Sequence, residues 1–131
     1  MVAHGDLEIA RSTSALRLLE TSQPPAYYIP PADVNEELLS KSIRRSFCEW
    51  KGEASYFDLA VDEPVEQLAW RYENPATPYA GLANYYAFYA QLADCSVNGE
   101  EVVPNEGSFY GGWVTSNIVG PFKGGPGTSF W

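Results

Sequence analysis

The sequence predicts a mainly β domain: two antiparallel sheets packed compactly as a barrel or a sandwich, with one or two short helices. Ten prolines and eleven glycines divide the 131 residues into short elements. Apolar and polar residues alternate in several segments, most clearly from Glu53 to Val61. Turn-forming pairs separate these segments, and the Asn98-Gly99 pair is the strongest hairpin signal in the chain. Together these features favour many short strands over a few long helices.

The first third of the chain mixes several patterns. We expect residues 1–5 to be a frayed end, residues 7–20 to form two short strands and the aromatic segment 26–30 to be extended. Asp33 is a candidate N-cap, and acidic residues precede basic ones over residues 34–46. Four apolar residues recur there at roughly helical spacing: Val34, Leu38, Leu39 and Ile43. This segment is therefore the one convincing helix that the sequence predicts.

A strand–turn–strand unit follows. Residues 46–50 and 53–61 are expected to be strands, and Lys51-Gly52 the tight turn between them. One face of the second strand would hold Ala54, Tyr56, Asp58 and Ala60, and the other face Ser55, Phe57, Leu59 and Val61. A further strand over residues 65–73 would align Leu68, Trp70 and Tyr72, which places Arg71 on the opposite face.

The last third contains one clear signal. Residues 82–97 fit a strand or a helix, but Asn98-Gly99 predicts a hairpin between residues 94–97 and 100–103. Beyond Pro104, aromatic residues alternate with glycine pairs. We expect residues 1–131 to form a single domain, with residues 104–131 as a strap packed on it.

Charge and hydropathy restrict the partners. Seventeen acidic and eight basic residues give a net charge of −9, and the pI is about 4.4. Because nucleic acids and anionic membranes are bound through clustered cations, we predict neither as a partner. No signal-peptide pattern and no apolar run of spanning length occurs in the sequence, which favours a cytoplasmic protein. The expected partner is a small molecule, and the protein is expected to be a monomer or a homodimer.

Several kinds of chemistry lack the residues that they need. The chain has two cysteines, Cys48 and Cys95, and one histidine, His4. These cannot build a structural zinc site, and a catalytic triad would need a histidine in the folded body. Asp58, Asp62 and Glu63 form a loose acidic run that favours a solvated loop over a magnesium site. We predict no metal and no cofactor.

The strongest remaining candidates lie around the predicted turn. Lys51 follows Cys48 closely, and a nearby lysine can lower the pKa of a thiol enough to make it reactive. Cys48 could equally be a small buried residue and Lys51 a solvated turn residue. The aromatic residues Tyr56, Trp70 and Tyr72 could form core, or the walls of a ligand site.

A resemblance to a known family adds to these residues. The segments "ETSQPPAYYIPPADV", "CEWKGEASYFDL", "AWRYENP" and "YYAFYAQLADCSVNGEEV" resemble, in this order, the DUF427 family, whose function is not established. The resemblance runs from about Leu7 to Val103. It implies a compact β domain with a tent-like pair of antiparallel sheets around a pocket. The family pattern falls on Tyr28, Pro30, Cys48, Lys51, Gly52, Ala54, Tyr56, Trp70, Tyr72, Phe88 and Tyr89.

Three functions remain open. The leading hypothesis is a protein that binds a small polar or anionic molecule between Tyr56, Trp70 and Tyr72, with Lys51 supplying a cation and Arg71 nearby. The second is a small enzyme that uses a Cys48 thiolate activated by Lys51. The third is a structural protein that self-associates through its glycine-rich tail. Whether the protein is an enzyme is left open by the sequence.

Overall fold

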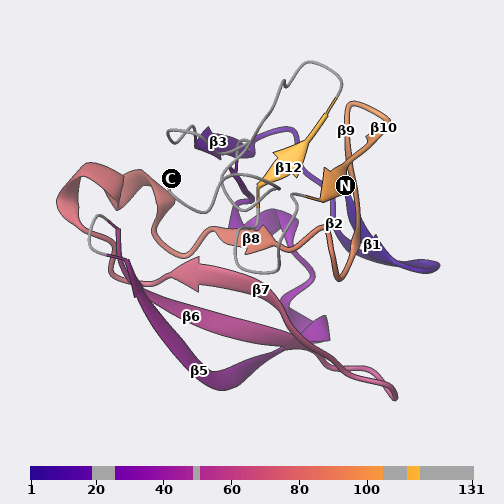
Figure 1. Cartoon of the computed structure of the whole chain (residues 1–131), viewed down its shortest axis with the longest axis horizontal. Coiled ribbons are helices and arrows are strands. Elements are labelled where there is room, and N and C mark those ends of the chain that lie inside the picture. The colour runs from indigo at the N-terminus through magenta and orange to yellow at the C-terminus, as the bar shows by residue number, and fades with distance from the viewer. Residues whose placement is uncertain (19–25, 49–50, 105–111, 116–131) are drawn as a thin grey trace, which may run out of the picture.

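A computed structural model describes residues 1–18, 26–48, 51–104 and 112–115. They form two four-stranded sheets and two two-stranded pairs, all antiparallel. The predicted mainly β, sandwich-like class is confirmed. Within the described ranges the sheets do not close into a barrel. Figure 1 shows the sheet β5–β8 along one side of the molecule and the sheet containing β1, β2 and β9 standing beside it.

The larger sheet is a meander in the order β5-β6-β7-β8. Its strands are β5 (Leu39–Cys48), β6 (Gly52–Leu59), β7 (Val65–Tyr72) and β8 (Tyr86–Phe88). The predicted hairpin between β5 and β6 is confirmed, but Gly52 is the first residue of β6 and pairs with Cys48, so the turn precedes Gly52 instead of containing it. Gly52 has a φ of 109°, a conformation that side-chain-bearing residues rarely adopt.

The second sheet has the order β10-β9-β1-β2. It contains β1 (Val2–His4), β2 (Leu7–Ala10), β9 (Asp94–Val97) and β10 (Glu100–Glu101). The Asn98-Gly99 hairpin is confirmed, with φ values of 51° and 81° at its two turn residues. The expected frayed end at residues 1–5 is wrong, because β1 lies between β2 and β9 and Val2 is fully buried. Long-range pairing supplied a partner that local sequence does not reveal.

Two short pairs complete the β structure. β3 (Leu16–Leu18) pairs with β4 (Ala26–Tyr28), and β11 (Val103–Pro104) pairs with β12 (Trp113–Val114). A bridge between Ile29 and Tyr86 joins the end of β4 to β8. The two expected strands within residues 7–20 therefore correspond to β2 and β3. Most of the expected strap (residues 105–111 and 116–131) lies outside the described residues.

The predicted helix over residues 34–46 is wrong. Only short 3₁₀ turns form here, η1 (Pro31–Asp33) and η2 (Glu36–Leu38), and β5 begins at once at Leu39. The expected N-cap Asp33 is instead the last residue of η1, and its side chain accepts a hydrogen bond from Ser12 at 2.6 Å. Val34 is buried whereas Ile43 is fully exposed, so the apolar residues share no buried helical stripe. Pairing with β6 overrides the helical spacing. The third 3₁₀ turn, η3 (Thr77–Leu82), lies between β7 and β8.

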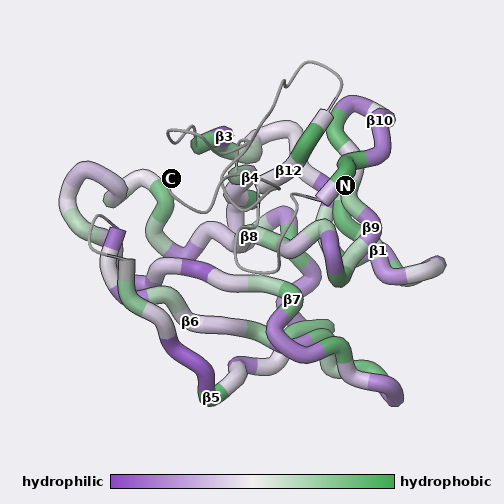
Figure 2. The backbone as a smooth tube through the Cα atoms, viewed as in Figure 1, coloured by the Kyte–Doolittle hydropathy of each residue, from purple (hydrophilic) through white to green (hydrophobic). Residues whose placement is uncertain are grey.

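The two faces of the β5–β8 sheet pack into different clusters. The predicted alternation in β6 is confirmed: Phe57 and Leu59 join the main core, whereas Ala54 and Tyr56 join a second, aromatic cluster. Leu68 does not align with Trp70 as expected, because Gln67 has a positive φ of 55° and Leu68 packs in the main core. Figure 2 shows a strongly hydrophilic stretch on β5. None of the helices that the structure describes is long and apolar enough to cross a membrane.

Candidate functional site

Three of the predicted site residues lie together on one face of the sheet. Tyr56 pairs with Trp70, and Ala54 pairs with Tyr72. Because paired residues and residues two apart point to the same side of a sheet, the three aromatic side chains share one face. Tyr28, from β4, meets Trp70 edge-on at 6.3 Å and Tyr72 at 6.5 Å between ring centroids. Tyr89 lies 4.6 Å from Trp70. These five rings form what we call the aromatic face.

Two cations lie against the aromatic face. The Lys51 side chain is only 7% exposed, and its Nζ lies 5.9 Å from the ring centroid of Tyr72. The Arg44 guanidinium lies 4.3 Å above the ring of Tyr56 and donates to Gln67 Oε1 at 2.6 Å. Both separations fall within the range of cation–π attraction. Lys51 and the aromatic residues predicted to act with it are thus brought together.

The turn that carries Lys51 is held from outside the hairpin. The Ala76 amide donates to the Lys51 carbonyl at 2.8 Å, which ties the turn to the segment after β7. A Cβ at Gly52 would meet the Asn74 carbonyl oxygen at 3.4 Å, and the positive φ adds strain. The backbone of Cys48 ends β5, but its side chain lies outside the described part of the structure.

Arg71 lies on the opposite face of the sheet from Trp70 and Tyr72, as strand alternation predicts. It donates to Glu73 at 2.7 Å and to the Tyr86 hydroxyl at 2.8 Å. Its guanidinium also lies 4.9 Å from the ring centroid of Phe57. Arg71 therefore cannot join the aromatic residues in one site, although the sequence analysis grouped them.

Arg71 belongs instead to a polar network at the edge of the main core. Glu73 accepts hydrogen bonds from Lys41 at 2.7 Å and from Ser55 at 2.9 Å, in addition to Arg71. The hydrogen bond from Lys41 is the largest cause of a pKa of about 2 at Glu73, with Arg71 and Ser55 adding to it. Tyr86 donates to Glu36 at 3.0 Å, and burial raises the Tyr86 pKa to about 12. This network joins η2, β5, β6, β7 and β8.

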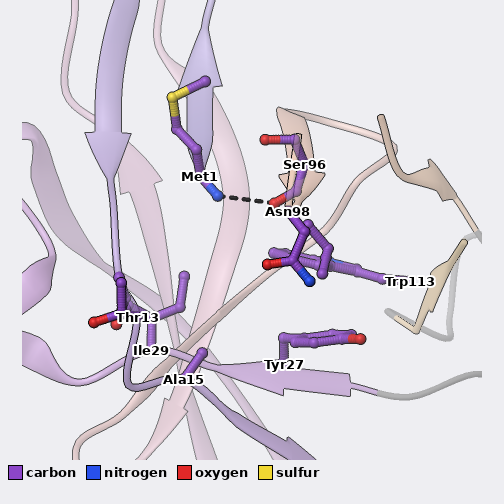
Figure 3. A pocket seen from close by; sticks show the side chains of 10 residues that line it. Met1, Thr13, Ala15, Tyr27, Ile29, Ser96, Asn98 and Trp113 are labelled. Carbon is purple, nitrogen blue, oxygen red and sulfur yellow. Dashed lines mark hydrogen bonds between the residues drawn. The ribbon is translucent and has the colours of Figure 1, made fainter. Parts of the chain in front are cut away.

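A separate pocket of about 190 Å³ lies between the second sheet and the two short strand pairs. Figure 3 shows the rings of Tyr27 and Trp113 one above the other on one side of it, with Thr13, Ala15 and Ile29 on the other. The two rings are stacked, with centroids 5.0 Å apart and planes 20° from parallel. The full lining is Met1, Ser12, Thr13, Ala15, Tyr27, Ile29, Ser96, Val97, Asn98 and Trp113.

The walls of the pocket are fixed by specific contacts. The Trp113 indole donates to the Phe88 carbonyl at 2.9 Å, which sets the orientation of its ring. Ser12 donates to Asp33 at 2.6 Å, and the Met1 amino group donates to the Ser96 carbonyl at 2.8 Å (Figure 3). Every side chain in the lining is uncharged. The pocket therefore combines an apolar ring wall with hydroxyl and amide groups.

Comparison with known families identifies the domain. A family model described as a domain of unknown function (DUF427) and labelled NTP_transf_9 matches residues 1–99. The chain belongs to the DUF427 family. No curated protein matches it.

In this DUF427 chain, sequence reasoning missed the pocket residues Tyr27 and Trp113. Alternation along the extended segment 26–30 already places Tyr27 and Tyr28 on opposite faces, so a second aromatic surface was implied. Asn98 was identified only as a turn residue. Trp113 stands in the glycine-rich tail and gave no signal of its own, because its position depends on pairing with β11.

The described ranges of this DUF427 chain contain no group of three or more His, Cys, Asp or Glu side chains placed to hold a metal ion. Asp58 accepts a hydrogen bond from the Gln67 amide at 2.8 Å, whereas Asp62 and Glu63 are exposed. Asp58 therefore stabilises the bulge at Gln67, and Asp62 and Glu63 lie in the exposed turn between β6 and β7, so the three acidic residues do not form one site.

Proposed function

We propose that this protein binds a small polar molecule in the pocket between Tyr27, Trp113, Thr13 and Asn98. The observation that supports this most directly is a preformed cavity whose one wall is a stacked pair of aromatic rings. Ligand sites typically combine apolar and aromatic walls with a few polar groups that fix orientation. Here the hydroxyls of Ser12 and Thr13 and the amide of Asn98 supply those groups.

The volume limits the ligand to about one ring with small substituents. An apolar cavity of about 150 Å³ accommodates benzene, and this pocket measures about 190 Å³. A ring that bears an amide or hydroxyl group would rest against the Tyr27–Trp113 wall and hydrogen-bond to the polar side. The lining side chains are uncharged, and the Met1 ammonium beside them is already hydrogen-bonded to the Ser96 carbonyl. We therefore expect a neutral ligand, because a charged one would be desolvated in the pocket.

Benzamide is a suitable probe, because it joins one ring to one amide. We expect saturation-transfer NMR to detect benzamide binding to the wild-type protein at millimolar concentration. The variant Thr13→Trp should fill the cavity and abolish the signal. Thr13 is exposed, so the substitution should leave the thermal unfolding midpoint nearly unchanged.

Thr77→Trp is the matched control, since Thr77 is also exposed but lies in η3, outside the pocket lining. This variant should bind benzamide as the wild type does. Equal signals from Thr13→Trp and Thr77→Trp would refute the pocket as the binding site. So would a wild-type protein that shows no transfer from benzamide.

The aromatic face supports a second candidate, an anionic ligand. Its support is the placement of two cations, Lys51 and Arg44, over tyrosine rings on the same face of the sheet. A carboxylate or phosphate beside Lys51 would gain a charge-assisted hydrogen bond at a site screened from water. The five rings are largely buried, so the ligand would enter beside the partly exposed Tyr89.

Benzoate distinguishes the two candidates, because it has the shape of benzamide and a negative charge. If the anionic site operates, benzoate should bind to the wild type and to Thr13→Trp, and Lys51→Met should weaken binding about tenfold. Benzoate binding that Thr13→Trp removes and Lys51→Met leaves intact would eliminate the aromatic face and assign both ligands to the pocket.

A further inference from the structure

Strand β5 presents the most exposed apolar side chains of the described chain. Ile43 is 100% exposed and Phe47 is 75% exposed, more than any other large hydrophobic residue that the structure describes. Both lie on β5, which pairs with β6 on one side and is the edge of its sheet. Two such residues on one sheet edge differ from scattered surface hydrophobics, which need no explanation.

The exposure of Ile43 results from an ordered bulge. Lys41 pairs with Phe57 and Arg45 pairs with Ser55, so β5 contains two more residues than β6 between these two pairs. The Arg44 amide donates to Ser42 Oγ at 3.2 Å, and the Arg45 side chain donates to the Ser42 carbonyl at 2.9 Å. Bulges at sheet edges re-aim side chains and interrupt pairing. This bulge thus holds Ile43 outward and prevents a partner from extending the sheet continuously across it.

The surroundings of Ile43 are cationic. Lys41, Arg44 and Arg45 provide three of the eight basic residues in a chain whose net charge is −9. Lys41 is paired with Glu73 and Arg45 lies 3.6 Å from Glu53. The side-chain contacts described for Arg44 are the neutral Gln67 amide and the Tyr56 ring, so its charge remains available beside the exposed isoleucine. Figure 2 shows this hydrophilic stretch on β5.

We propose that the edge of β5 at Ile43, Phe47 and Arg44 docks an acidic segment of another protein. Successive apolar side chains of that segment would cover Ile43 and Phe47, and its carboxylates would face Arg44, whose guanidinium lies over Tyr56. Symmetric pairing with a second copy is disfavoured, because it would bring the arginines of the two β5 edges together. Head-to-tail contact with a second copy would leave the same edge free on the last molecule of the chain unless the copies closed into a ring.

The test uses fluorescein-labelled peptides and the full-length protein. A short peptide of alternating glutamate and valine should bind, as measured by fluorescence anisotropy, and a lysine–valine peptide of the same length should not. Ile43→Ser should weaken binding of the glutamate–valine peptide about tenfold, and raised salt should weaken binding to the wild type. Ile43 is fully exposed, so the variant should unfold at the wild-type temperature.

Val103→Ser is the matched control, because Val103 is also exposed (59%) but lies on β11. It should bind the peptide as the wild type does. The proposal is wrong if the two peptides bind alike, if neither binds, or if Ile43→Ser binds like Val103→Ser. It is also wrong if sedimentation shows self-association of the wild type that Ile43→Ser abolishes, since the occupant would then be a second copy.

Discussion

Arg71 and Glu73 lie on the same face of the sheet, with Arg71 Nη2 2.7 Å from Glu73 Oε2, and on the opposite face from the rings of Trp70 and Tyr72. Aromatic residues (Trp70, Tyr72) thus alternate with charged residues (Arg71, Glu73) along this segment, and the two pairs face different environments. The aromatic pair packs into the aromatic face, and the charged pair completes a network with Lys41, Ser55 and Tyr86. Substitutions in the network should therefore affect stability without altering ligand binding at either candidate site.

The first prediction concerns Glu73. Its pKa falls from 4.5 to about 2 in the folded protein, chiefly through the hydrogen bond from Lys41. Between these values the unfolded chain binds more protons than the folded protein, so stability rises with pH. The contribution of Glu73 is complete above about pH 4.5 and is lost as the pH falls towards 2. Glu73→Gln should cost about 1 kcal/mol near neutrality, allowing for solvent screening.

Urea unfolding of the wild type and Glu73→Gln at several pH values measures this. The difference in unfolding free energy between the two proteins should shrink steadily as the pH is lowered through the acidic range. Glu66→Gln is a suitable control, because Glu66 is exposed on the same strand. A difference that stays constant with pH would show that Glu73 is not the titrating group.

The second prediction concerns the shape of the Arg71 side chain. Its planar guanidinium donates to Glu73 and Tyr86 at once and lies over the rings of Phe57 and Tyr86. Lysine can replace the charge but not the fork or the stacking. Thermal and urea unfolding should show a loss of about 1–2 kcal/mol for Arg71→Lys and about 2–4 kcal/mol for Arg71→Met, which removes one of the three side chains that donate to Glu73 and also the donor to Tyr86. A stability of Arg71→Lys equal to that of the wild type would mean that the fork geometry and the stacking contribute nothing.

The fold was predictable where local chemistry decides it. The alternation in β6, the Asn98-Gly99 hairpin and the hairpin between β5 and β6 each depend on neighbouring residues, and the structure confirms all three. The errors share one physical cause. The expectations that residues 1–5 would fray and that residues 34–46 would be helical were both wrong. In each case the strand that pairs with the segment, β9 for β1 and β6 for β5, lies elsewhere in the chain and gives no local signal. Pairing across such distances overrides local propensity.

The candidate site was predictable in part for the same reason. Strand alternation placed Trp70 with Tyr72 and separated Arg71 from both, whereas the pairing of Tyr56 with Trp70 depends on the register between β6 and β7. The pocket was beyond sequence reasoning, because its two rings come from segments separated by more than half of the chain. Tyr27 belongs to β4 and Trp113 to β12, and only the assembled sheets bring their rings together.

The third prediction concerns the turn that carries Lys51. Gly52→Ala should destabilise the protein by about 1–3 kcal/mol, because alanine must adopt a φ of 109° and place its Cβ 3.4 Å from the Asn74 carbonyl oxygen. Gly81→Ala is the matched control. Gly81 has no positive φ and nothing within 4 Å of an added Cβ, so this variant should be neutral or slightly stabilising. Urea unfolding of both variants should separate them, and equal stabilities would exclude strain at Gly52.

The last prediction concerns the thiol of Cys95. Cys95 is a free cysteine on β9, 4% exposed, and burial raises its pKa from 9.0 to about 12. Since only the thiolate is alkylated, the folded protein should react far more slowly at mildly alkaline pH than an exposed thiol would. In Cys48→Ser, where Cys95 is the remaining cysteine, iodoacetamide labelling followed by mass spectrometry should be negligible in native buffer and complete in urea.

The same measurement on Cys95→Ser then isolates Cys48, whose labelling rate as a function of pH tests activation by Lys51. An apparent pKa well below about 8.5 would support the enzyme hypothesis, and a value at or above it would remove that hypothesis. Lys51→Met should raise the apparent pKa of Cys48 if the lysine is the activating group. Rapid labelling of Cys95 in native Cys48→Ser would instead show that β9 opens readily and that the burial of Cys95 does not protect it.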